Sequence, residues 1–254
     1  MGYCDACGTE LDDEMNYCSN CGQSVKALGP ETNPEGKSPF EGGVFSLSLG
    51  YSFQNDKRPL VIGGLITLAG MIVPFVGWIS TGYGFQLCRA VARGQTQRPD
   101  FDDYGEMFID GMWLTLVVLV YGGAFMALVF ALVLGATQAN EPVALAGVLG
   151  LLVLLLYLLP GALTVVAATE EMGAAFSTEY LVPFVLSGTY LKAMVLWTVL
   201  SVGLWIALFL SIFTIVGFPF VSALFNYVAG TFWGYFYREA AERGDVPPAP
   251  DLAV

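Results

Sequence analysis

Four cysteines near the N-terminus are the residues whose types and spacing best suit a chemical role. Cys4, Cys7, Cys18 and Cys21 follow the pattern C-x2-C-x10-C-x2-C, and a glycine comes directly after each pair. Two residues between cysteines let both thiolates bind one ion from a tight turn, and the glycine lets backbone N–H groups approach the sulfur atoms. Four thiolates form a closed tetrahedral site without a water ligand, so the pattern predicts structural rather than catalytic Zn²⁺.

Two other chemistries stay open for these thiols, a pair of disulfides and a rubredoxin-like iron site. Disulfides do not require the paired spacing, and thiols stay reduced in the cytosol, where we expect this end of the chain. A segment as short as residues 1–25 buries too little apolar surface to fold alone. We therefore predict that residues 1–25 form a zinc ribbon that its metal stabilises.

The predicted ribbon is acidic. Residues 1–25 contain five Asp or Glu residues and no Lys or Arg. Ribbons that bind nucleic acid need basic residues to neutralise phosphates. We therefore expect a cytosolic protein partner for the ribbon and no nucleic acid.

The rest of the chain offers little catalytic chemistry. It contains no His, which excludes His general bases, His-containing triads and HExxH metalloprotease sites. No pair of nucleophile and base stands out within an apolar segment, so we predict that the protein is not an enzyme. The fifth cysteine, Cys88, is far from the other four in sequence, and we expect it to be a buried free thiol.

The composition after the ribbon is that of a membrane protein. Hydrophobic residues make up 56% of the 254 residues, charged residues only 13%, and the mean hydropathy is +0.64. Residues 60–88, 113–140 and 142–169 contain no charged residue. A bilayer-spanning helix needs about 20 apolar residues, so the chain is predicted to be an all-α polytopic membrane protein.

The basic residues predict how the apolar segments cross the bilayer. Pro74 and Gly77 divide residues 60–93, and Lys or Arg residues flank this segment on both sides. A hairpin keeps both basic clusters on the cytosolic side, whereas a single pass would put one outside. About six spans follow, with the first and last pairs as short hairpins: 60–76, 77–93, 112–135, 143–168, 193–215 and 220–237. All ten Lys and Arg and both termini are then cytosolic, in a multi-pass protein of the cell membrane.

The predicted domain limits follow from these segments. They are a zinc ribbon (1–25), a flexible linker (26–43), a helical transmembrane domain (44–244) and a disordered tail (245–254). Residues 44–55 alternate apolar and polar side chains as a strand does. A lone strand beside a bilayer would leave backbone groups unpaired, so we favour an interfacial helix there.

Three polar or small-residue patterns are candidates for function. Asp103, Glu106 and Asp110 form a candidate interfacial acidic stripe, either a cation-attracting mouth or the polar side of an interfacial helix that pairs with Arg93 and Arg98. Glu170 and Glu171 close the fourth span, either in an ion path or as a solvated helix end. Gly230 and Gly234 form a GxxxG pattern that can pack against another helix.

Three segments carry a resemblance to a known family. They are "LGYSFQNDKRPLVIGG", "GYGFQLCRAVARGQTQRPDFDDYGEMFIDGMW" and "YFYREAAERG". Over residues 44–244 the chain resembles the prokaryotic membrane family called domain of unknown function 4013, which is common in haloarchaea and includes members with an N-terminal zinc ribbon. The resemblance implies an integral membrane protein and supplies no catalytic residues. The net charge of −12 also predicts a halophilic source.

Two functions are consistent with these features. The first is a non-enzymatic membrane protein whose cytosolic ribbon binds a protein partner. The alternative is a small-solute or ion transporter or channel, based on the number of spans and on a faint repeat between residues 45–94 and 176–244. Ion paths need buried polar groups, and these spans offer only Ser, Thr and Asn226, so we favour the first.

Overall fold

The computed structural model describes residues 2–3, 10–11, 43–53, 57–136, 141–214 and 217–249. The chain divides into two compact units, Met1–Pro39 and Phe40–Val254. In the first unit, β1 (Gly2–Tyr3) and β2 (Glu10–Leu11) pair antiparallel, with Gly2 opposite Leu11. The predicted linker 26–43 lies outside the described residues except at its end.

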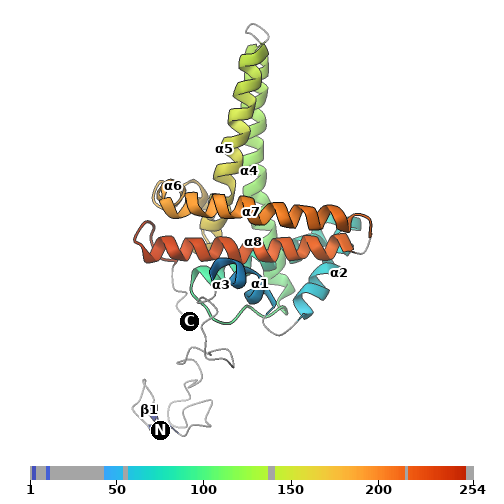
Figure 1. Ribbon diagram of the computed structural model, residues 1–254, viewed down its shortest axis with the longest axis vertical. Coiled ribbons are helices and arrows are strands. Elements are labelled where there is room, and N and C mark those ends of the chain that lie inside the picture. Colours follow the sequence, from blue (N-terminus) through green and yellow to red (C-terminus); the bar gives the residue numbers. More distant parts are fainter. Residues whose placement is uncertain are drawn as a thin grey trace. The chain divides into compact units, whose positions relative to one another are not determined.

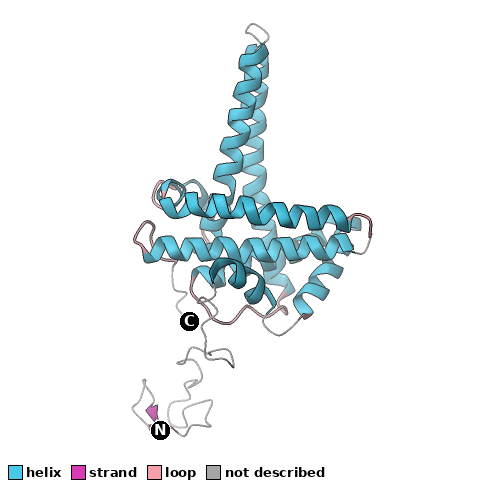
Figure 2. Cartoon of the chain, viewed as in Figure 1, coloured by secondary structure: helices cyan, strands magenta, loops and turns pink. Residues whose placement is uncertain are grey.

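The described part of the second unit is helical (Figures 1 and 2). Its elements are α1 (Gly43–Phe53), α2 (Arg58–Ile72), the 3-10 helix η3 (Pro74–Val76), α3 (Gly77–Ala92), α4 (Tyr104–Ala136), α5 (Glu141–Thr169), the 3-10 helix η4 (Met172–Phe176), α6 (Leu181–Leu186), α7 (Gly188–Ser211) and α8 (Gly217–Glu242). The all-α prediction is confirmed for these residues.

The segment with strand-like alternation is a helix, as favoured from the sequence. In α1, Leu47 and Tyr51 are buried and lie one helical turn apart, whereas Phe45 and Leu49 are exposed. The hydroxyl of Tyr51 donates to the carbonyl oxygen of Gln97, 2.7 Å away, beyond the end of α3. Burial raises the pKa of Tyr51, so its hydroxyl stays protonated and keeps this bond.

The chain folds back on itself between α2 and α3, as the hairpin prediction requires. Val73 is extended, because the ring of Pro74 disfavours a helical conformation at the residue before it. A Cβ on Gly70 would lie 2.7 Å from the Cα of Gly77, so the helices approach closely at the turn. The helices contain 15 and 16 residues, or about 22–24 Å each at 1.5 Å per residue.

Three helices are long and apolar enough to cross a membrane. They correspond to α4, α5 and α7, with candidate spans Tyr104–Leu134, Leu145–Thr169 and Gly188–Ser211. In the described part of the chain, α2 is apolar but shorter, and α3 and α8 are not candidates. The prediction of six spans is therefore supported for three helices. The last predicted pair is not short, because α7 has 24 residues and α8 has 26.

Two helix pairs dominate the view in Figure 1. α4 packs beside α5, and α7 packs beside α8. The α7–α8 pair runs across the direction of the α4–α5 pair, so these helices do not form a parallel bundle. Most of the exposed large apolar side chains belong to α4, α5 and α7.

Glycines let α3 pack closely on two neighbouring helices. A Cβ on Gly230 would lie 2.0 Å from the carbonyl oxygen of Gly84, and one on Gly234 would lie 2.3 Å from that of Cys88. On the α4 side, a Cβ on Gly111 would lie 2.0 Å from the carbonyl oxygen of Trp78. No side chain fits at these contacts, so the predicted packing role of the GxxxG pattern is confirmed.

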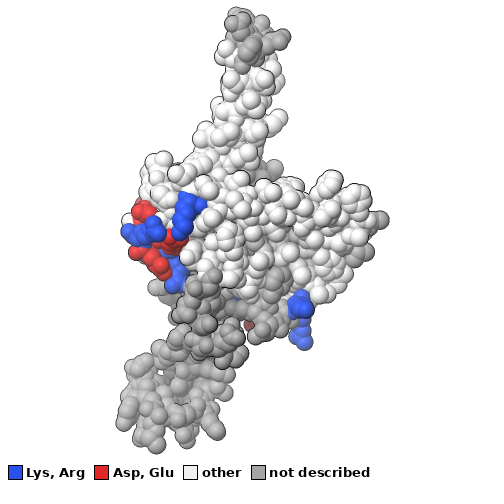
Figure 3. All heavy atoms as spheres, in the orientation of Figure 1, with Lys and Arg blue, Asp and Glu red and all other residues white. Residues whose placement is uncertain are grey.

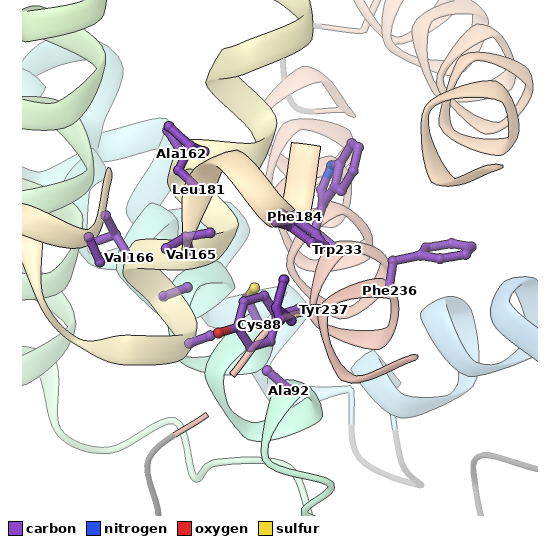
Figure 4. Packing of buried hydrophobic residues seen from close by; sticks show 14 of the residues in the cluster. Cys88, Ala92, Ala162, Val165, Val166, Leu181, Phe184, Trp233, Phe236 and Tyr237 are labelled. Carbon is purple, nitrogen blue, oxygen red and sulfur yellow. The ribbon is translucent and has the colours of Figure 1, made fainter. Parts of the chain in front are cut away.

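Figure 4 shows the buried cluster that these contacts enclose. Cys88 of α3 lies beside Tyr237 of α8, and Val165 of α5 and Phe184 of α6 complete the same core. Cys88 is 4% exposed and forms no disulfide. The prediction of a buried free thiol is therefore confirmed.

α3 and α8 end in the same way. Gly94 and Gly244 have φ values of 72° and 78°, which favour glycine. The residue after each glycine donates its backbone N–H back into the helix, from Gln95 to Ala90 and from Asp245 to Ala240. Both ends are Schellman caps, and they lie at the C-terminal ends of the two segments of the faint repeat.

The packed part of the chain continues into the predicted tail. Val246 is buried, and the hydroxyl of Tyr237 donates to the carbonyl oxygen of Pro247. Residues 245–249 therefore pack against the helical unit, whereas 250–254 lie outside the described residues.

Candidate functional site

The four predicted zinc ligands, Cys4, Cys7, Cys18 and Cys21, lie outside the described residues. Residues 4–9, which contain the first cysteine pair, connect two strands that pair antiparallel. Four thiolates in two C-x2-C pairs are the donor set of a closed tetrahedral zinc site.

The main polar site of the helical unit joins the ends of α3, α4 and α5. We call it the Arg89 cluster, and it consists of Gln86, Arg89, Arg93, Glu106, Asp110 and Glu170. Arg89 contacts three carboxylates: Nη2 lies 3.0 Å from Asp110 Oδ1, Nη1 lies 3.4 Å from Glu106 Oε1, and Nε lies 2.9 Å from Glu170 Oε1. The Nε contact is an ion pair without hydrogen-bond alignment.

Asp110 is the most enclosed carboxylate of the Arg89 cluster. Its side chain is 9% exposed, and that of Arg89 is 14% exposed. Gln86 donates from Nε2 to Asp110 Oδ2 at 3.1 Å, so both carboxylate oxygens have a partner. A buried ion pair of this kind costs desolvation energy, which the added hydrogen bonds offset.

Glu170 holds the end of α5 against α3. Its φ of 61° is the only positive value at a non-glycine residue in the described part of the chain. This conformation is unfavourable for a side chain with a Cβ. Arg93 Nη2 and Arg89 Nε both lie 2.9 Å from Glu170 Oε1, so two guanidinium groups stabilise the carboxylate in this position.

The three acids of the predicted stripe have different environments. Asp103 Oδ1 accepts a hydrogen bond from the backbone N of Glu106 at 3.0 Å at the start of α4. Glu106 is exposed, whereas Asp110 is buried. Glu106 and Asp110 pair with Arg89 of α3. Arg93, which we expected together with Arg98 to pair with the stripe, instead pairs with Glu170, so Glu170 is paired rather than only solvated.

The sequence reasoning missed Gln86 and Arg89. A signal was available, because Gln86, Arg89 and Arg93 are spaced i, i+3 and i+7 and therefore share one face of a helix. The sequence did not show which residues this face of α3 would contact. Those contacts depend on how the chain runs from α3 to α4 and on where α5 ends.

A second polar feature lies within α5. Pro160 has no N–H, and the next N–H in α5, that of Gly161, has the carbonyl oxygen of Tyr157 as its partner in a regular helix. The hydroxyl of Tyr190 accepts from Gly161 N at 3.1 Å and donates to the carbonyl oxygen of Tyr157. This inserted hydroxyl ties α7 to the interior of α5, and we call the arrangement the Tyr190 insertion.

A second group of charged side chains pairs near the ends of α7 and α8. Lys192 of α7 lies 3.0 Å from Glu239 of α8, which also pairs with Arg243. Figure 3 shows these charges at one side of the visible face, whereas the surface of α4, α5 and α7 is almost free of charge. These paired charged groups therefore lie near the ends of apolar helices.

An all-helical unit with three candidate spans and a preceding ribbon defines a membrane protein with an N-terminal zinc-ribbon domain. The family described as "Protein of unknown function (DUF4013)" matches residues 65–216, and the "zinc-ribbon domain" matches residues 3–25. The first match covers more than half of the chain, so the protein belongs to this family. No curated protein and no solved structure matches the chain.

The two matches agree with the predicted organisation. The family match contains α3 to α7 with the whole Arg89 cluster, although it is narrower than the expected 44–244. The zinc-ribbon match contains all four predicted ligands and implies zinc binding. The halophilic source stays a prediction.

Proposed function

We propose that this protein is a non-enzymatic membrane protein whose zinc ribbon binds a cytosolic protein. The observation that carries the proposal is an acidic zinc-ribbon domain in the same chain as a family-matched unit with three candidate spans. A closed Cys4 site has no open position for a substrate. The surface of the ribbon, rather than its metal, is then what a protein partner would contact.

The pairing within the Arg89 cluster supports a structural role for the charged residues of the helical unit. Arg89 is engaged by three carboxylates, and both oxygens of Asp110 have partners. These contacts tie together three helix ends at a membrane boundary. Such a site offers no free base or nucleophile.

For the membrane unit we propose six spans with both termini in the cytosol. The basic ends of α3 and α8 and the start of α7 then face the cytosol, and the connection between α4 and α5 lies on the other side. Six roughly parallel spans require the α4–α5 pair to turn toward the α7–α8 pair within a bilayer. Pro160, which interrupts the ladder of α5, is a place where such a turn can occur.

The transporter alternative has weaker support. The cavity between the helices is lined mainly by apolar side chains, and its two threonines bond to their own helices. A path for ions needs polar groups that can replace water.

Partner capture from membranes tests the proposal. Tagged full-length chain and a variant lacking residues 1–40 are purified under the same conditions, and bound proteins are compared. A partner that depends on residues 1–40 is expected. The double variant Cys4→Ser/Cys7→Ser should lose it as well, whereas the control Cys88→Ser should retain it. An identical partner set from all four chains would exclude a docking role.

A further inference from the structure

A cavity of about 250 Å³ lies between α3, α4, α5, α7 and α8. Apolar side chains dominate its lining, including Phe85, Leu114, Leu163 and Trp197. Ligand pockets for small molecules typically measure about 300–1,000 Å³. The cavity can therefore hold a small apolar molecule, but not a phospholipid with two chains.

The hydroxyl groups of the lining are already used. Thr81 donates from Oγ1 to the carbonyl oxygen of Gly77 at 3.3 Å, and Thr164 donates to that of Pro160 at 2.7 Å. Both bonds lie within the residue's own helix. These side chains therefore add few polar groups to the cavity.

Two hydrogen-bond donors of the lining remain available. Trp233 is 6% exposed. Among the described residues, neither its indole N–H nor the side-chain amide of Asn226 makes a hydrogen bond. Neither donor atom is fully buried, so a ligand can reach both. A ligand with an oxygen acceptor would satisfy either donor.

The charges near the cavity do not favour an anionic ligand. The guanidinium of Arg89 lies 5.7 Å from the ring centroid of Phe85, which lines the cavity. That guanidinium is held by three carboxylates, so its charge is already neutralised. The ligand should therefore be neutral.

We propose that this cavity binds a neutral, mainly apolar small molecule that carries one carbonyl, ether or hydroxyl oxygen. The oxygen accepts a hydrogen bond from the amide of Asn226, and the apolar part fills the space beside Pro160. Such a molecule reaches the cavity from the apolar phase around α4, α5 and α7. This inference does not depend on the ribbon or its partner.

Quenching of tryptophan fluorescence by brominated probes tests the inference on full-length protein in detergent. Trp197 and Trp233 line the cavity, and bromine quenches tryptophan at contact. We expect 6-bromohexan-1-ol to quench part of the signal with saturation, and 1-bromohexane to bind more weakly. Asn226→Leu should weaken binding of the alcohol by about 2- to 10-fold, as expected for one hydrogen bond, and leave binding of the bromoalkane unchanged.

Filling the cavity provides the matched comparison. Ala229 lines the cavity, whereas Ala207 lies on the exposed face of α7. Ala229→Leu should remove the saturable phase, and Ala207→Leu should retain it. If Ala229→Leu does not fold, Ala167→Leu at the same cavity replaces it. Two results would overturn the proposal: quenching that never saturates, and saturable quenching that Ala229→Leu leaves unchanged. A chain-brominated phospholipid that quenches to the same extent and with saturation would overturn it as well.

Discussion

At the scale of single residues, Arg89 connects three helix ends of the molecule. It lies on α3 and binds carboxylates from α4 and from the end of α5. Its removal would leave Asp110 buried without a cation. An uncompensated buried charge is much more costly than the loss of an exposed pair.

Replacing Arg89 should therefore destabilise the protein strongly. We expect Arg89→Leu to lower the free energy of unfolding by about 3–5 kcal/mol. The control is Arg243→Leu, because Arg243 is 56% exposed and pairs with Glu239 within α8. That variant should lose less than about 1 kcal/mol. Unfolding by denaturant in micelles measures both, and equal losses would refute a special role for the Arg89 cluster.

The Tyr190 insertion gives a second prediction at this scale. Tyr190→Phe removes the hydroxyl and leaves Gly161 N–H and the carbonyl oxygen of Tyr157 without this partner. We expect a loss of about 1–3 kcal/mol in the free energy of unfolding. Tyr235→Phe is the control, since the hydroxyl of Tyr235 makes no hydrogen bond with the described residues. If Tyr190→Phe is as stable as the control, the hydroxyl is not needed, and Gly161 N–H would bond directly to the carbonyl oxygen of Tyr157.

At the scale of elements, the contact between α3 and α8 depends on glycine. Gly234 faces the backbone of α3 at Cys88, whereas Gly203 of α7 has no atom within 4 Å of the position of a Cβ. The same change from Gly to Ala should thus have opposite effects at the two positions. Comparing the two variants therefore distinguishes the effect of close packing between α3 and α8 from the effect of helix propensity alone.

Gly234→Ala should lower the free energy of unfolding by about 1–3 kcal/mol, because the backbones must move apart. Gly203→Ala should be neutral or raise it by up to about 1 kcal/mol, because alanine favours helix over glycine. Thermal unfolding in detergent gives both values. A loss of similar size at Gly203 would argue against close packing as the cause.

The sequence predicted elements where local chemistry decides them. Pro74 and Gly77 mark the turn between α2 and α3, and the apolar runs mark α4, α5 and α7. It also predicted that α3 and α8 cross a membrane, but neither is among the three candidate spans. Their residues Tyr83, Tyr227 and Phe232 are buried against protein, and hydropathy does not distinguish burial in protein from burial in lipid. The Arg89 cluster escaped prediction for a related reason, because its members come from distant parts of the chain.

At the scale of the whole molecule, the ribbon and the helical unit are separate compact units. Removing the metal should therefore unfold the ribbon and leave the helices folded. With a zinc chelator, a soluble maleimide should gain access to four thiols, while Cys88 stays protected in its core. An unchanged thiol count before and after chelation would favour the disulfide alternative, and a visible absorption band would favour iron.

The most direct test of the central claim is the side of the membrane on which the ribbon lies. Oriented vesicles are treated with an impermeant maleimide, and labelling is followed at the ribbon thiols after chelation, at Thr96→Cys and at Ala139→Cys. We predict that the ribbon and Thr96→Cys react from the cytosolic side, and that Ala139→Cys, in the connection from α4 to α5, reacts only from the opposite side. Labelling of the ribbon and Ala139→Cys from the same side would contradict a cytosolic ribbon attached to this membrane unit.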